Sequence, residues 1–226
     1  TNYLKNSLDI KSLDENQANI SYIILFIITI LVIYLLYYIN SVINLSKKNC
    51  DYMNTLYKSM NGKIRPLNDR DSLCRRNLVD YYIKTAYNAC SGGNYKHGVV
   101  NLCNLKAVLS QGVRGIDFEI YSKDSIPIVA TSTSDDYYFK QTYNHVTFKN
   151  VMNVIKDYAF ASGTSPNFED PIILHLRIKS NDQDMISNLV EVLKLHSDIL
   201  LGKEFSYENY SEKISNIKLL DLKKKV

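Results

Sequence analysis

The chain has 226 residues, of which 46% are hydrophobic, and a formal net charge of +4 at neutral pH. This length allows one ordinary domain with an additional segment. The small net charge, without a long block of like charge, argues against a nucleic-acid-binding protein.

The first predicted element is a membrane-spanning helix. Residues 20–39 read ISYIILFIITILVIYLLYYI, without charge, proline or glycine. At about 1.5 Å per residue, a helix of this length crosses the hydrocarbon core of a bilayer. The run is too long for a cleaved signal peptide and lacks the polar face of a buried core helix. The predicted anchor residues at its two ends, where tyrosines suit the membrane interfaces, are Ile20, Tyr22, Tyr37, Tyr38 and Ile39.

The charges on either side of the span predict how the chain crosses the membrane. Residues 1–19 form an N-terminal tail with two lysines and three acidic residues. After the span at residues 20–41, residues 42–65 are mainly basic, and the positive-inside rule therefore places the C-terminal part in the cytoplasm. Apolar residues at helical spacing up to Gly62 predict a partly amphipathic juxtamembrane helix or linker, whose basic residues contact anionic lipid headgroups.

Residues 66–226 alternate between strand and helix patterns. Strands are predicted at 81–86, 113–121, 126–130 and 172–178, and the terminal LKKKV reads as the opening of a further strand. Helices are predicted at 101–110, 148–159 and 185–200. Repeated βα units with apolar strands indicate an α/β fold with a parallel sheet, either a (β/α)₈ barrel or a doubly wound sheet.

The length of this region limits the choice of fold. A complete barrel needs about 250 residues, so residues 66–226 would supply roughly its first half. We then expect the chain to be a fragment of a longer polypeptide or to be completed by a partner. The sequence has no GxGxxG motif and no P-loop, so nucleotide binding has no support.

The four cysteines form no CxxC pair, and no histidine lies at zinc-ligand spacing from them, which argues against a structural zinc site. A pair between Cys90 and Cys103 and free buried thiols are the two alternatives. We favour free thiols, which are typical of a reducing compartment.

Two carboxylates stand out in the predicted strand GVRGIDFEIY. Asp117 and Glu119 are two residues apart and therefore share one face of the strand. On their own they indicate either ordinary strand-end polarity or one wall of a pocket.

Residues 66–226 resemble the X region of phosphatidylinositol-specific phospholipase C. The stretches that carry the resemblance are KTAYNACSG, GVRGIDFEIY, IPIVATST, VIKDYAF and PIILHLRIKS, and Gly112, Arg114 and residues 158–160 are its specific parts. The resemblance implies the first half of a TIM-barrel-like (β/α) fold, preceded here by a transmembrane helix. The combination of anchor and Tyr/Asn-rich barrel is most similar to phospholipase-C-like proteins of large DNA viruses.

The resemblance also implies a loss of catalysis. The family cleaves a phosphodiester with two histidines, one acting as base and the other as acid. Here the first histidine position holds Tyr87 and the second holds Thr131, and neither takes up a proton near neutral pH. His175, two residues before Arg177, is the best single substitute, although a lone histidine is more often a packed or hydrogen-bonded residue.

The family's eukaryotic enzymes hold calcium through oxygen ligands, and this metal site is altered as well. Three ligand positions match Asn88, Asp117 and Glu119, whereas the fourth, a glutamate in the family, is Arg177. A guanidinium there opposes a bound cation and suits a bidentate ion pair with the carboxylates instead. We therefore predict no metal and no cofactor. The predicted relict pocket consists of Tyr87, Asn88, Asp117, Glu119, Thr131, His175 and Arg177.

Three functions follow as hypotheses. The first is a non-catalytic minor capsid protein of a large DNA virus that links the internal membrane to the capsid. Its partners would be the lipid bilayer and virion proteins, and its domain would lie in the cytoplasm or between inner membrane and capsid. The second is a membrane-bound phosphodiesterase with a remodelled site around His175. The third is a lipid-headgroup module in which Arg177 and Arg114 hold a phosphate.

Overall fold

The structure, a computed structural model, describes residues 2–134, 138–206 and 214–226. The chain divides into two compact units, with the boundary between Asn44 and Leu45. The second unit contains the sheet and all helices after the first.

The first unit consists of the N-terminal part of helix α1 (Asn2–Leu56), which continues into the second unit. The sequence of α1 contains no proline or glycine, so nothing interrupts its backbone hydrogen bonds. The part Asn19–Leu56 is long and apolar enough to cross a membrane, with a mean hydropathy of 2.7 over its most apolar window. Length and composition therefore support the predicted span, and the helix continues without a break into the predicted juxtamembrane segment.

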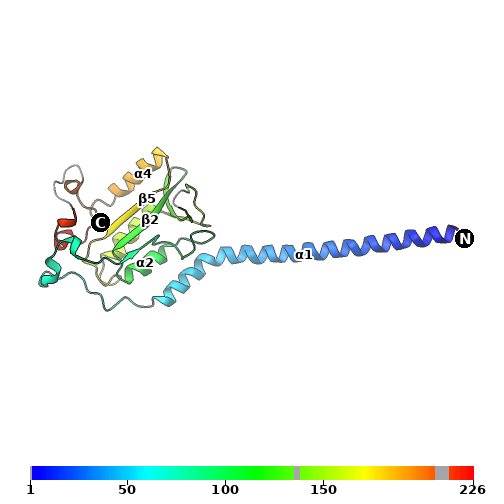
Figure 1. Ribbon diagram of the computed structural model, residues 1–226, viewed down its shortest axis with the longest axis horizontal. Helices are drawn as coiled ribbons and strands as arrows, with labels where there is room; N and C mark the ends of the chain where they lie inside the picture. The colour runs from blue at the N-terminus through cyan, green and yellow to red at the C-terminus, as the bar shows by residue number, and fades with distance from the viewer. Residues whose placement is uncertain (1, 135–137, 207–213) are drawn as a thin grey trace. The chain divides into compact units, whose positions relative to one another are not determined.

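The second unit is built on a mixed sheet centred on β2 (Gly115–Lys123). β1 (Thr85–Ala86) and β5 (Ile173–Ile178) pair with β2 in parallel. β3 (Ile126–Ala130) pairs with β2 antiparallel, and β4 (Val146–Thr147) pairs antiparallel with β3. Figure 1 shows β2 and β5 side by side.

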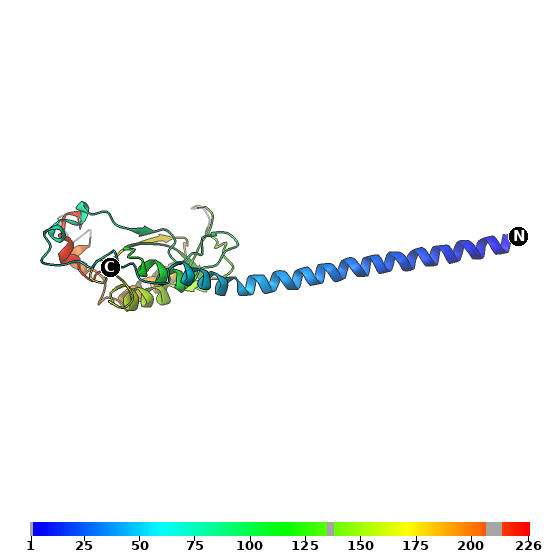
Figure 2. The ribbon, with the colours of Figure 1, turned by 90° about the horizontal axis from the view of Figure 1, so that it is seen from below.

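Three helices cover one face of this sheet: α2 (Leu102–Ser110), α3 (Phe148–Val154) and α4 (Gln183–Lys194). Figure 2 shows them together on one side of the strands. A π-helical turn, Ile155–Ala159, follows α3. The main hydrophobic core lies between helices and sheet and includes Ile116, Phe118 and Ile120 of β2. Because side chains alternate along a strand, the odd-numbered residues of β2 point to the opposite face.

The antiparallel pairing of β3 corrects the prediction of a parallel sheet. Asp124 and Ser125 join β2 to β3 with φ values of 52° and 58°. Two consecutive residues with positive φ make the type of tight turn that reverses a hairpin. The chain therefore returns directly beside β2 instead of crossing over through a helix.

Two other predicted strands differ from the structure. Of the strand expected at 81–86, only Thr85–Ala86 pairs with β2, and the preceding Tyr82 is fully exposed. The terminal LKKKV, residues 222–226, was expected to open a further strand, but only its first residue lies in a regular element, the 3₁₀ helix Leu219–Leu222, and a turn and two coil residues follow. There the carbonyl groups of Lys225 and Val226 accept hydrogen bonds from the amides of Ile172 and Leu201.

A disulfide joins Cys50 of α1 to Cys103 of α2, which corrects the prediction for the cysteines. Cys74 and Cys90 are free, so neither a Cys90–Cys103 pair nor a fully reduced set is present. The last turns of α1 lie against the start of α2, where Asn101 Nδ2 donates to Ser46 Oγ at 2.8 Å. This contact brings Cys103 next to α1, whereas Cys90 is buried in the core.

Candidate functional site

The polar residues of the candidate site come from two neighbouring parallel strands. Asp117 is in register with His175, and Glu119 is in register with Arg177. All four side chains belong to the sheet face opposite the helices, because they occupy alternate positions of β2 and β5. The sheet therefore brings together two carboxylates, an imidazole and a guanidinium.

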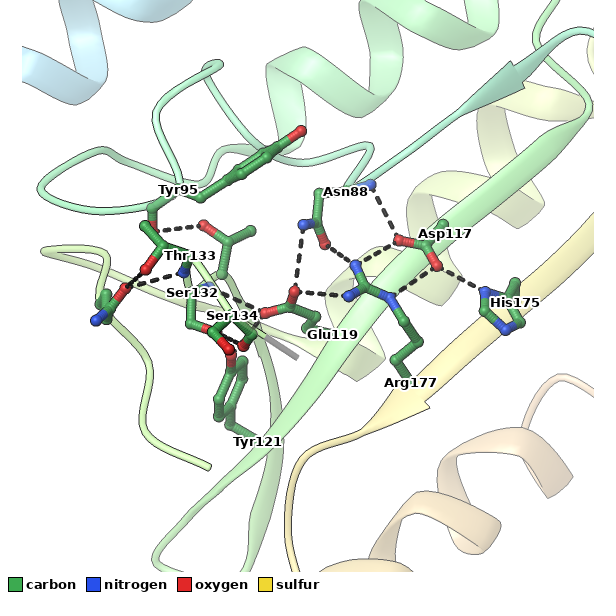
Figure 3. Close-up of polar contacts among 12 residues, drawn as sticks. Asn88, Tyr95, Asp117, Glu119, Tyr121, Ser132, Thr133, Ser134, His175 and Arg177 are labelled. Atoms are coloured by element: carbon green, nitrogen blue, oxygen red, sulfur yellow. Dashed lines mark hydrogen bonds and ion pairs between the residues drawn. The ribbon is translucent and has the colours of Figure 1, made fainter. Parts of the chain in front are cut away.

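Arg177 lies at the centre of the site, as Figure 3 shows. Its Nε is 3.1 Å from Asp117 Oδ2 and its Nη2 is 2.8 Å from Asp117 Oδ1, which makes a bidentate pair. Its Nη1 is 2.8 Å from Glu119 Oε1, and Nη2 also donates to Asn88 Oδ1 at 3.1 Å. The structure thus contains the ion pair that the sequence predicts, with both carboxylates engaged.

The turn after β1 closes the site on one side. Asn88 has a φ of 47°, and its backbone N–H donates to Asp117 Oδ1 at 3.2 Å. The ring of Tyr87 lies over the guanidinium of Arg177, with 4.3 Å between Cζ and the ring centroid. Half of Tyr87 is exposed, so this ring forms part of the rim of the site.

Glu119 has two further partners that the sequence reasoning missed. Its Oε2 accepts from the hydroxyl of Tyr121 at 2.6 Å and from the backbone N–H of Ser132 at 3.0 Å. Tyr121 was detectable in principle, because it lies two residues after Glu119 on the same strand face. Thr131, by contrast, donates its hydroxyl hydrogen to the carbonyl oxygen of Tyr95 and makes no hydrogen bond with either carboxylate.

The two carboxylates at the centre of the site are shielded from solvent. Glu119 is 1% exposed and Asp117 is 9% exposed. Burial alone would raise the pKa of Asp117, but hydrogen bonds from Arg177, His175 and the Asn88 amide together hold it below its ordinary value. Burial and the neighbouring Glu119 raise the pKa of Tyr121, which keeps its hydroxyl protonated as a donor.

His175 is the exposed member of the network. Its Nδ1 lies 2.6 Å from Asp117 Oδ2, and 67% of its side chain is exposed. It opens onto a shallow hollow of about 300 Å³ that is also lined by Tyr87, Asp117 and Arg177. Asp117 thus orients the imidazole of the one histidine that lines this hollow.

Arg114 does not belong to this site. Its guanidinium lies at the other end of the sheet, where Nη2 donates to Ser165 Oγ at 2.7 Å and to the Ala159 carbonyl at 2.8 Å. The hollow that it lines is separate from the one beside Arg177. The two arginines that the headgroup hypothesis assigns to one phosphate therefore line different hollows.

The donor set beside Arg177 does not suit a metal ion. Among the residues that the structure describes, no cluster of three or more His, Cys, Asp or Glu side chains could hold one. The carboxylate oxygens that would bind a hard cation already accept hydrogen bonds from a guanidinium.

Comparisons with known proteins agree with this architecture. The family described as "Phosphatidylinositol-specific phospholipase C, X domain" matches residues 74–226. Among solved structures, PLC21 of L. pealei is 20% identical with a TM-score of 0.54, over 74% of this chain and 20% of that chain. PLC21 of S. officinalis is 21% identical with a TM-score of 0.53, over 67% of this chain and 18% of that chain.

These matches concern the fold. The chain spans about a fifth of the length of the two solved structures. Among curated proteins, none matches the sequence. The predicted half of a TIM-barrel-like fold is confirmed.

Proposed function

Because this chain belongs to the phosphatidylinositol-specific phospholipase C X-domain family, we propose that it is a non-catalytic, membrane-anchored structural member. The observation that carries this proposal is the position of Arg177. Its guanidinium fills the space between Asp117, Glu119 and Asn88 that the family resemblance assigns to a cation. The positive charge that the carboxylates need is thus supplied by the chain itself.

The proton chemistry of the site supports the same proposal. General acid–base cleavage of a phosphodiester needs two titratable groups around phosphorus. Tyr87 and Thr131 occupy the two histidine positions of the family. Thr131 is buried, and its hydroxyl donates a hydrogen bond to the carbonyl oxygen of Tyr95. His175 is the one histidine among the residues that line the hollow, whereas this mechanism needs two proton-transferring groups.

Calcium binding to an Arg177→Glu variant tests this account. The substitution removes the guanidinium and adds a carboxylate, which gives a set of hard oxygen ligands. We expect calcium to raise the melting temperature of this variant and to leave the melting temperature of the wild type unchanged. A calcium-dependent shift of equal size in the wild type would contradict the proposal.

More specifically, we propose that the protein is a minor capsid protein that links the internal membrane of a large DNA virus to its capsid. Its support is the resemblance in overall design, together with an N-terminal helix that is apolar enough to span a membrane. Co-sedimentation of the full chain with capsid components tests this form. Failure to co-sediment would contradict the role in linking membrane and capsid, but it would not contradict the proposal that the domain is non-catalytic.

One observation favours a second candidate, a phosphodiesterase with a remodelled site. The exposed His175 is oriented by Asp117 like a general base. In that case His175→Ala abolishes turnover of a lipid or glycan phosphodiester while the domain stays folded. Arg177 is less suited to a headgroup site, because its N–H groups already donate to Asp117, Glu119 and Asn88.

A further inference from the structure

Two adjoining hollows lie away from the polar site, around the start of β5. The first has a volume of about 450 Å³ and an apolar lining that includes Leu174, Leu176 and Leu200. The second has a volume of about 310 Å³ and includes Arg114 in its lining. Both are lined by Leu78, Pro171 and Ile173, so the two hollows adjoin one another.

Arg114 is buried beside the second hollow without a full set of hydrogen-bond acceptors. Arg114 is only 5% exposed. Nη2 has acceptors, but Nε and Nη1 are buried and have none among the described residues. Burial lowers the pKa of Arg114 to about 10. Buried N–H groups without acceptors are destabilising, because they have lost water without gaining a hydrogen bond.

The charges around the second hollow favour an anion as that partner. Arg114 and Lys84 bring two positive charges to its lining, against one negative charge from Asp170. Asp170 does not form an ion pair with Arg114; its oxygens accept from the Leu67 amide and from Asn167 Nδ2, each at 2.9 Å. The hollow therefore has a net formal charge of +1, and its one carboxylate is already engaged.

We propose that the two hollows form one binding site for an amphipathic anion with a single acyl chain. The anionic head, a carboxylate or a phosphate monoester, lies at Arg114, and the acyl chain follows the apolar lining past Ile173 toward Leu176. The two hollows together have the volume of an ordinary small-molecule site, about 300–1,000 Å³. A guanidinium is also the side-chain group best suited to bind a carboxylate or a phosphate, because it can donate two hydrogen bonds to either.

This site is distinct from the one assigned to the proposed function. It uses neither the carboxylates nor the guanidinium of the Arg177 network, and Ile173 is the one lining residue that it shares with the hollow beside His175. The N-terminal helix, if it spans a membrane, anchors the chain in a bilayer that supplies such ligands. The inference therefore stands whether or not the polar network is catalytic.

Photolabelling of the full chain in phosphatidylcholine nanodiscs tests the proposal. The probes are diazirine derivatives of lauric acid, of a lysophosphatidic acid and of the neutral dodecanol, and the labelled peptides are mapped by mass spectrometry. We expect the anionic probes to label the segments around Ile173 and Leu222, and an excess of the unlabelled anion to suppress this labelling. Labelling by lauric acid alone or by lysophosphatidic acid alone identifies the source of the anionic head.

Three variants make the test specific. Arg114→Gln removes the charge, and Ile173→Trp fills the junction of the hollows at a strand position that accepts an aromatic side chain. We expect both to reduce labelling by at least about tenfold, which corresponds to about 1.4 kcal/mol of binding free energy. Leu195→Trp is the matched control, because Leu195 is 65% exposed and lines neither hollow.

The proposal is overturned if neither anionic probe labels these segments, or if the folded Ile173→Trp variant is labelled as strongly as the wild type. Equal labelling by dodecanol would overturn the role of the anionic head. If Arg114→Gln fails to fold, the Ile173→Trp variant and the comparison of probes still decide the outcome.

Discussion

Arg177 is the residue on which the stability of the polar network depends. It is the only guanidinium in contact with the buried carboxylates of Asp117 and Glu119 within the part of the chain that the structure describes. We expect Arg177→Ala to lower the free energy of unfolding by about 3–5 kcal/mol, because it removes the one guanidinium that pairs with both buried carboxylates. Chemical denaturation of both proteins measures this difference.

A matched control separates this effect from the loss of any ion pair. Lys156 pairs with Asp198 at 2.8 Å, but both side chains are about half exposed. Lys156→Ala should therefore change the free energy of unfolding by no more than about 1 kcal/mol. Equal losses in the two variants would show that the Arg177 network is not a buried charge cluster.

Asp117 predicts how stability depends on pH. Its pKa is held below the ordinary value of 3.8, so the folded state binds its proton less readily than the unfolded state. The resulting stability is present above about pH 3.8 and is lost as the pH falls through the lowered folded value. Asp117→Asn should remove this part of the acid sensitivity. Unfolding curves from neutral to acidic pH would contradict the prediction if wild type and variant lost stability in parallel.

At this scale the sequence predicted the parts of the site that lie on single strands. The two-residue spacing of Asp117 and Glu119 placed both carboxylates on one face, and the family resemblance placed Arg177 beside them. It could not predict that Ser132 donates to Glu119, because that contact depends on the β2–β3 hairpin. Whether the site is catalytically silent stays a prediction.

Among the elements, the end of α1 is fixed to the domain by a covalent bond. The Cys50–Cys103 disulfide closes a loop with a sequence separation of 53 residues. Chain-entropy arguments give a stabilisation of about 4 kcal/mol for a loop of this length. We expect the Cys50→Ser/Cys103→Ser variant to unfold at a lower temperature and to be cleaved faster by protease near the end of α1.

Cys74→Ser is the matched control, since Cys74 is a free and partly exposed cysteine. It should leave both the melting temperature and the rate of proteolysis unchanged. The disulfide prediction would be contradicted if the reduced wild type melted at the same temperature as the oxidised protein.

The sequence predicted most elements but not how all of them pair. The β3 strand was predicted with its bounds, because Ile126–Ala130 is a short apolar run. Its direction was missed, because Asp124 and Ser125 are not among the residue pairs that mark a hairpin turn most strongly. The disulfide was missed for a similar reason: it joins segments 53 residues apart in sequence, and their proximity follows from tertiary packing.

The whole molecule combines an N-terminal helix apolar enough to span a membrane with half of a barrel of the phospholipase C X-domain family. In this account the barrel keeps its framework, and an internal ion pair takes the place of the metal. The fold could be predicted from the alternation of strands and helices together with the motifs. Topology across the membrane remains a prediction from the charges on either side of the span.

The most direct test of the central claim is phosphatidylinositol hydrolysis by the full chain across a calcium titration, with thermal stability measured on the same samples. The account predicts no turnover and no calcium-dependent change in melting temperature. Turnover in the wild type that His175→Ala abolishes, without unfolding the domain, would contradict it and would show that this barrel carries out catalysis with a rebuilt site.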